Sequence, residues 1–211
     1  MPLGELSEIR TLEELFSQAT LRASNSMARW TGGAVALSLG PVEELPPEEA
    51  LGRLCLDDQV LTFVQLDIEG DASGRLLLAF DEDNLDRLAA TLLNGRSTTA
   101  AESALRESAL METANILGSA YLAVLSDAAA ALLLPSPPSL VRDYGASVLQ
   151  SAVMEHLLAS DRLLLLPILF DDSRARLTWQ AFFAPSPELM QLLRSRLAAT
   201  PPVDGVDSLA C

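Results

Sequence analysis

The amino-acid sequence predicts an α+β fold in which two pseudo-symmetric halves share one antiparallel sheet. The same order of elements, a helix, a strand, a hairpin and a closing helix, occurs in about residues 11–95 and again in about residues 99–198. Each half opens with a long helix, so we expect these two helices to lie side by side with their apolar sides against the sheet. The 211 residues, of which 49% are hydrophobic, suffice for one domain over residues 1–211, with a flexible tail at residues 199–211.

A capping box opens the first half, because Thr11 and Glu14 can each bond to the backbone of the other. The box predicts a helix over residues 12–30, which Gly32 and Gly33 end. The further elements of this half are a strand at 34–39, a connection rich in Pro and Glu at 41–50, a hairpin with strands at 59–68 and 75–80, and an amphipathic helix at 84–93.

A second capping box, formed by Thr99 and Glu102, opens the second half and predicts the other long helix. Its further elements are an apolar segment at 130–134 that leads into prolines at 135–138, a helix at 145–159, a hairpin with strands at 163–170 and 175–184, and a helix at 187–198.

The second long helix carries a polar stripe formed by Ser108, Glu112, Asn115 and Ser119. At about 100° per residue these positions share a narrow sector, with apolar residues on the opposite side. Two interpretations are open, a solvated face and a functional pair of one carboxylate and one carboxamide on a shared face. The composition favours the functional pair, because Glu112 is the only charged residue between positions 111 and 126.

The first long helix repeats this stripe in position but not in chemistry. A shift of 95 residues places Glu13, Ser17, Thr20 and Ser24 on the positions of the four stripe residues. Ser17 and Thr20 therefore stand where the second helix has its acid and its amide. We interpret the first half as a degenerate copy of a duplicated site, and we expect both stripes to be exposed together on the side away from the sheet.

The composition of the chain argues against several classes of partner and of chemistry. The net charge of −15 argues against a nucleic-acid partner, and the absence of Lys excludes lysine nucleophiles. The two cysteines, Cys55 and Cys211, cannot form a disulfide framework, and the longest uninterrupted apolar runs are too short to cross a bilayer. We therefore expect a cytoplasmic protein without a membrane partner. His156 has no companion ligand or nucleophile and is expected to be structural.

The run from Ser108 to Asn115 resembles the signature of the CheC, CheX and FliY family of chemotaxis phosphatases. That signature is Asp or Ser, three residues, Glu, two residues, Asn, and a Pro somewhat over twenty residues later. Ser108, Glu112 and Asn115 match it on a long helix that opens the second of two similar halves, and Pro137 or Pro138 supplies the proline. Because no flagellar-switch domain is expected after residue 198, the resemblance favours CheC or CheX over FliY, with CheC the nearest.

The resemblance implies hydrolysis of the aspartyl phosphate on a CheY-type response regulator. Asn115 would place a water in line with the phosphorus, and Glu112 would engage a lysine of the regulator. Ser108 and Pro138 would support the helix or contact the partner. Mg²⁺ is expected on the regulator, and this chain is expected to carry no cofactor and no metal site. A CheD-like deamidase is a further candidate partner.

The resemblance also implies a single functional site. Family members with two sites carry Glu and Asn in both halves, whereas Glu13, Ser17 and Thr20 mark a degenerate first site. A second interpretation is a noncatalytic signalling or flagellar-switch module, which docks a receiver domain without dephosphorylating it. The retained Glu112 and Asn115 favour the phosphatase.

Overall fold

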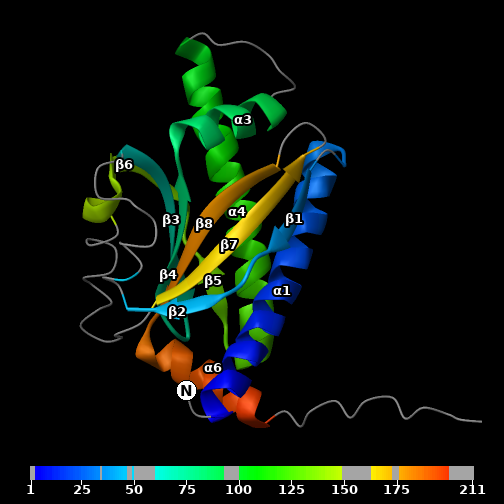
Figure 1. The fold of residues 1–211 in the computed structure, drawn as a ribbon, viewed down its shortest axis with the longest axis vertical. Coiled ribbons are helices and arrows are strands. Elements are labelled where there is room, and N and C mark those ends of the chain that lie inside the picture. The colour runs from blue at the N-terminus through cyan, green and yellow to red at the C-terminus, as the bar shows by residue number, and fades with distance from the viewer. Residues whose placement is uncertain are drawn as a thin grey trace, which may run out of the picture.

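The structure is a computed structural model that describes residues 3–33, 35–46, 49, 60–92, 100–148, 163–172 and 176–199. An antiparallel sheet lies at the centre of the fold (Figure 1). Its strands are β1 (Val35–Leu39), β2 (Glu43–Leu45), β3 (Val60–Gly70), β4 (Gly74–Phe80), β5 (Leu133–Pro135), β6 (Ser139–Tyr144), β7 (Leu163–Asp172) and β8 (Arg176–Pro185). The main path runs in the order β1, β7, β8, β4, β3 and β5, while β2 pairs with β7 and β6 pairs with β3.

The sheet has the two-half symmetry that the sequence predicts. The hairpins β3–β4 and β7–β8 meet at its centre, where Leu77 of β4 lies opposite Phe182 of β8. The outer strands are exchanged between the halves. β1 and β2 of the first half pair with β7, and β5 and β6 of the second half pair with β3. Each half therefore completes the sheet edge of the other, which leaves fewer unpaired backbone groups at the edges.

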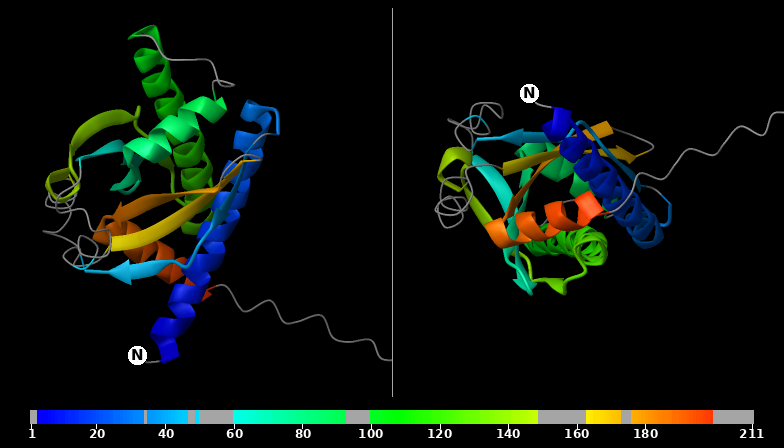
Figure 2. Two further views of the ribbon diagram at one scale, coloured as in Figure 1. Left: turned by 45° about the horizontal axis from the view of Figure 1, so that its top comes forward. Right: turned by 90° about the horizontal axis from the view of Figure 1, so that it is seen from below.

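The helices with defined bounds are α1 (Leu3–Thr31), α3 (Glu82–Leu92), α4 (Ala100–Ala129) and α6 (Pro187–Ala199). The two long helices, α1 and α4, lie side by side, as predicted for the two opening helices, and they run in opposite directions (Figure 1). Figure 2 shows α6 close to both of them, on the same side of the sheet. The α+β prediction is thus confirmed.

The main core lies between these helices and one face of the sheet. Phe16 of α1, Tyr121 of α4 and Phe183 of β8 are each at most 2% exposed. The ring centroid of Phe16 lies 5.4 Å from that of Phe183 and 6.0 Å from that of Tyr121. Aromatic pairs at such separations contribute beyond the burial of their area. One aromatic cluster therefore holds both long helices against the sheet.

A smaller apolar cluster covers part of the opposite face of the sheet. It includes Phe63, Leu77 and Phe182, whereas the neighbouring Val64 and Leu66 of β3 belong to the helix-side core. Successive side chains of a strand point to opposite faces, so a strand that is buried on both faces needs a continuous apolar run. This requirement explains the apolar run at the start of β3.

The apolar character of α4 follows from its position in this core. Over Ala104–Ala129 it is long and apolar enough to cross a membrane by length and composition alone, and 56% of its most apolar window is buried in the protein. Leu117 and Leu125 are fully buried, and the helix packs on α1, α6 and β3. The composition is therefore that of a helix in the core of a domain.

The prediction that a capping box at Thr11 begins the first long helix is wrong, because α1 begins at Leu3 and continues through Thr11. Leu6 and Ile9 continue the apolar spacing in front of Leu12, so Thr11 and Glu14 lie within the helix. The second long helix begins at Ala100, directly after Thr99, which lies outside the described residues.

The strands β2 and β6 were missed because neither has an apolar alternation. β2 has three residues, and the side chains of β6 are half-buried or exposed. Their pairing with β7 and β3 supplies the stabilisation that their own side chains lack. The predicted helix at 145–159 is helical at 145–148, and its remainder, including His156, lies outside the described residues. Cys55, Cys211 and the predicted tail after residue 199 also lie outside them.

Candidate functional site

A hollow of about 630 Å³ lies between the two long helices, on the stripe side of α4. From α4 it is lined by Glu112, Asn115, Ile116, Ser119 and Ala120. From α1 it is lined by Arg22, Ser26 and Arg29. The structure therefore brings Glu112 and Asn115 together in one concave surface, and it adds a wall from the other helix that the sequence did not indicate.

Glu112 and Asn115 are both available to a partner. Glu112 is exposed and Asn115 is half-buried, one turn further along α4. None of the ion pairs and hydrogen bonds found among the described residues involves either side chain. A carboxylate can accept from a cationic donor, while a carboxamide can donate and accept at once. The hollow thus holds two complementary polar groups without an internal partner in the described part of the chain.

The buried side of α4 determines that the stripe faces outward. Ala114, Leu117 and Leu125 have no exposed surface and face the sheet. Gly118 allows close approach of the helix to β3, because a Cβ at this position would lie 2.9 Å from Cδ2 of Leu66. At about 100° per residue, Glu112 lies on the opposite side of the helix from Ala114, so packing the Ala114 side on the sheet places Glu112 on the outer side.

The first stripe is not exposed in the way the sequence predicts. Ser17 is exposed, but Thr20 is 2% exposed and Glu13 is half-buried. The Thr20 hydroxyl donates to the backbone oxygen of Phe16 at 2.8 Å and forms a further hydrogen bond with the Tyr121 hydroxyl. The expectation that both stripes lie exposed together is therefore wrong, because Tyr121 of α4 covers Thr20.

The same 95-residue shift that relates Thr20 to Asn115 relates Ser26 to Tyr121. Ser26 lines the hollow beside Asn115, whereas the bulky Tyr121 occupies the equivalent place beside Thr20. The side chain on the facing helix thus differs between the two halves. A small residue leaves the second position open, and a large one fills the first.

Burial also explains the chemistry of Tyr121. It raises the pKa of the phenol to about 12, against a smaller lowering by the hydrogen bond to Thr20. The hydroxyl of Tyr121 therefore stays protonated near neutral pH. While the Thr20 hydrogen is directed at Phe16, the neutral phenol is the group that can donate in this pair; after ionisation the Thr20 hydroxyl would donate to the phenolate, which is the direction that lowers the pKa.

Ser24, the last residue of the first stripe, has a structural role. Its hydroxyl accepts a hydrogen bond from the backbone N–H of Leu37 in β1 at 2.8 Å. The matching stripe residue on α4, Ser119, is exposed and lines the hollow. In the first half, two of the four stripe positions thus serve the fold.

Ser108 and Pro138 do not line the hollow with Glu112 and Asn115. Ser108 is exposed one turn before Glu112, while Pro138 is buried and Pro137 is exposed. The structure thus separates the two prolines by burial, although the sequence left them equivalent.

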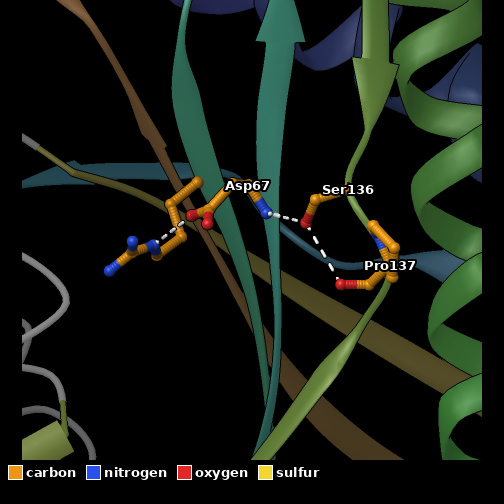
Figure 3. Close-up of polar contacts among 4 residues, drawn as sticks. Asp67, Ser136 and Pro137 are labelled. Atoms are coloured by element: carbon orange, nitrogen blue, oxygen red, sulfur yellow. Dashed lines mark hydrogen bonds and ion pairs between the residues drawn. The ribbon is translucent and has the colours of Figure 1, made fainter.

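The segment in front of these prolines is tied to β3 by Ser136 (Figure 3). Its backbone N–H donates to the backbone oxygen of Asp67, and its hydroxyl accepts from the backbone N–H of Asp67, each at 2.9 Å. The Asp67 carboxylate in turn accepts from Nε of Arg75 at 2.6 Å. These contacts fix the backbone ahead of Pro137, and sequence reasoning did not single out Ser136.

Sequence reasoning also missed Arg22, Ser26 and Arg29. Their spacing of four and then three residues places them on one face of α1. Nη2 of Arg29 donates to the hydroxyl of Ser26 at 2.9 Å. The signal was available as a basic helix face in an acidic chain, but only the packing of α1 on α4 shows that this face meets the stripe.

A second hollow of about 360 Å³ continues from the first and shares Arg22 and Ser119 with it. Its lining is more apolar and includes Leu122, Leu134 and Pro135. Leu134 is half exposed, and the neighbouring Leu132 is exposed to a similar degree. The polar hollow is therefore bordered at one end by an apolar surface from β5 and the turn in front of it.

Comparisons with known proteins give matches in structure alone. No family model and no curated protein matches this sequence. FliY of Thermotoga maritima superposes with a TM-score of 0.69 at 13% identity, covering 91% of this chain and 96% of that one. The FliM middle domain from H. pylori gives a TM-score of 0.58 at 14% identity, with 92% and 98% covered.

CheX in its complex with CheY, BeF₃ and Mg²⁺ from Borrelia burgdorferi gives a TM-score of 0.54 at 16% identity, with 80% of this chain and 96% of that chain covered. At such identities the likeness concerns the fold, and function has to be argued from the site. The chain adopts the fold of the CheC, CheX and FliY family, as the motif on α4 predicts.

Proposed function

We propose that this protein hydrolyses the aspartyl phosphate of a CheY-type response regulator, using Glu112 and Asn115. The observation that carries the proposal is their joint position in the hollow between α1 and α4, without an internal partner among the described residues. The fold supports it, because one neighbour is CheX in a complex with CheY. From the same neighbours, one of them described as a chemotaxis protein CheX, we propose a chemotaxis context and a cytoplasmic location.

The proposed roles follow from the chemistry of the two side chains. The Asn115 amide would accept one hydrogen bond from a water and donate one to it or to the phosphoryl group, which holds the water in line with phosphorus. The Glu112 carboxylate would pair with a lysine of the regulator at the edge of the hollow. Mg²⁺ would be held by the regulator, where it neutralises charge on the phosphoryl group.

We propose a single active site, on α4. In the first half, Thr20 is enclosed by Tyr121 and has no access to a docked partner. Ser17 is exposed but carries neither a charge nor an amide. The substitutions in the first stripe and the covering phenol act together, so no second catalytic pair is available there.

A binding module without catalysis is the alternative, and the FliM neighbours favour it. FliM from H. pylori, which shares this fold, has been solved in complexes with FliG and with SpeE. The surface around the hollow would then dock a receiver without turnover. A CheD-like deamidase stays a proposed second partner under either function.

The test is the decay of a phosphorylated CheY-type receiver, with Mg²⁺, in the presence of this protein. Asn115→Ala should slow the accelerated decay by about 100-fold, the scale on which misplacing a reacting group is felt. Asn25→Ala is the matched control, because Asn25 is an exposed amide on α1 that does not line the hollow. Wild-type turnover by Asn115→Ala would contradict the mechanism.

Glu112→Ala should weaken receiver binding and turnover together, because the partner lysine then loses its counter-charge. Glu107→Ala serves as its control, since Glu107 is exposed on α4 outside the hollow. If wild-type protein binds the receiver without accelerating decay, the noncatalytic module is the correct function.

A further inference from the structure

The charge of the hollow is opposite to the charge of the chain. The protein carries 29 acidic and 14 basic residues, yet the hollow contains two arginines and one carboxylate. Between Glu14 and Glu43 the chain has no acidic residue, so the second half of α1 contributes positive charge alone. Arg22 and Arg29 therefore form a local basic surface on an acidic protein, and such a surface attracts anions over several ångströms.

Within the described part of the chain, both guanidinium groups retain donors without a partner. Arg22 and Arg29 are exposed, and neither forms an ion pair with the described residues. Arg29 uses one nitrogen on the hydroxyl of Ser26, which holds its side chain along the helix. Elsewhere in the described part of the chain, the exposed Arg142 pairs with Glu82, and the half-buried Arg106 pairs with Asp86. Among the described residues, the two arginines of the hollow thus lack the carboxylate partner that Arg106 and Arg142 have.

We propose that Arg22 and Arg29 bind the phosphorylated face of the receiver and so complete the site on α4 from the opposite helix. The inference rests on the proposed function. A phosphoryl group brings a charge of about −1.5 to −2 and three acceptor oxygens, and guanidinium groups match such oxygens in pairs. The first half of the repeat thereby contributes the anion-binding wall of the one site that the second half retains.

The two helices contribute opposite charges to the hollow, and each charge would contact a different group of the partner. Glu112 would attract a cation of the partner, and the arginines on the facing helix would attract its anion. A net charge of −15 repels an acidic partner at long range, so a basic surface at the docking site lowers the barrier to encounter. The arginines should therefore affect affinity and its salt dependence more than the chemical step.

The test measures binding of a CheY-type receiver with and without beryllofluoride and Mg²⁺, which mimic the phosphorylated state without turnover. Wild type should prefer the activated receiver. Arg22→Gln with Arg29→Gln should weaken that binding about 10-fold, reduce its salt dependence and diminish the preference for the activated form. Arg87→Gln is the matched control, because Arg87 is an exposed arginine on α3, away from the hollow.

The outcomes separate this inference from the proposed function. If the double variant binds the activated receiver as tightly as wild type, the basic wall is refuted, whatever the turnover. If the double variant loses affinity while wild type shows no phosphatase activity, the wall is supported and the proposed catalysis is refuted. If wild type does not bind the activated receiver, both fail. Because both arginines are exposed, thermal unfolding of the variants should match wild type, which excludes a folding defect.

Discussion

The hydrogen bond between Thr20 and Tyr121 joins the two long helices inside the core, and removing the Thr20 hydroxyl alone should cost more stability than removing both hydroxyls. In Thr20→Val the side-chain shape is nearly kept, and the Phe16 oxygen retains its helical N–H donor. The Tyr121 hydroxyl, however, loses its partner at a site that is 2% exposed. A buried donor left without a partner costs about 1–3 kcal/mol, so we expect a loss of about 2 kcal/mol.

Tyr121→Phe should cost less, about 1 kcal/mol, because the Thr20 hydroxyl still donates to Phe16 at 2.8 Å. In the double variant Thr20→Val with Tyr121→Phe no polar group is left unpaired at this contact. Its cost should therefore be about 1 kcal/mol, which makes it more stable than Thr20→Val alone.

Urea unfolding, followed by far-UV circular dichroism, measures these differences, with the slope of each transition used to check that the unfolding mechanism is unchanged. For a protein of this size, about 2–4 °C in melting temperature corresponds to each kcal/mol. Additive losses, with the double variant less stable than either single variant, would refute the assignment of the Tyr121 hydroxyl to Thr20.

Two further predictions concern the same pair. Folding raises the pKa of Tyr121 from 10.0 to about 12. Between pH 10 and 12 the unfolded chain therefore releases the phenol proton while the folded chain keeps it. The free energy of unfolding should be insensitive to this phenol below pH 10 and should fall between pH 10 and 12. The slope should be about 1.4 kcal/mol per pH unit and be absent in Tyr121→Phe, as alkaline urea titrations of both proteins would show; equal slopes would contradict it. Ser17→Glu with Thr20→Asn, which places the acid and the amide of the motif on the first helix, should yield no second site while Tyr121 covers position 20. Phosphatase assays in an Asn115→Ala background measure this, and recovered turnover would contradict the role of Tyr121.

Elements with a strong local pattern were predictable from the sequence. The hairpin expected at 59–68 and 75–80 is β3 and β4, and the helix expected at 187–198 is α6. Alternation, turn residues and helix caps act between near neighbours in the chain, so they can be read without knowledge of the fold. The early start of α1 was missed because a capping pattern was given more weight than continued apolar spacing.

Strand pairing between the halves was less accessible. Strand β6 is polar and largely exposed, and it is a strand because six of its residues pair with β3. Likewise β1 and β2 find their partner in β7, far along the chain. The stabilisation of such strands comes from neighbours that are distant in sequence, which a local pattern does not contain.

The chemistry of the second helix could be read from its residues alone. The stripe of Ser108, Glu112, Asn115 and Ser119 depends on helical periodicity, which places these residues on one face wherever the helix is packed. The mismatch at Ser17 and Thr20 was likewise visible from the repeat. These features belong to single helices, and a single helix can be read from its own residues.

Which stripe is open, and which side chains face it, depends on how the two long helices pack together. Antiparallel packing of α1 on α4 places Tyr121 over Thr20 but the small Ser26 beside Asn115, and it brings Arg22 and Arg29 to the rim of the same hollow. The size and charge of a groove between two helices depend on both of them and on their register. No pattern within either helix could specify that register, because it is set by the shared core beneath them.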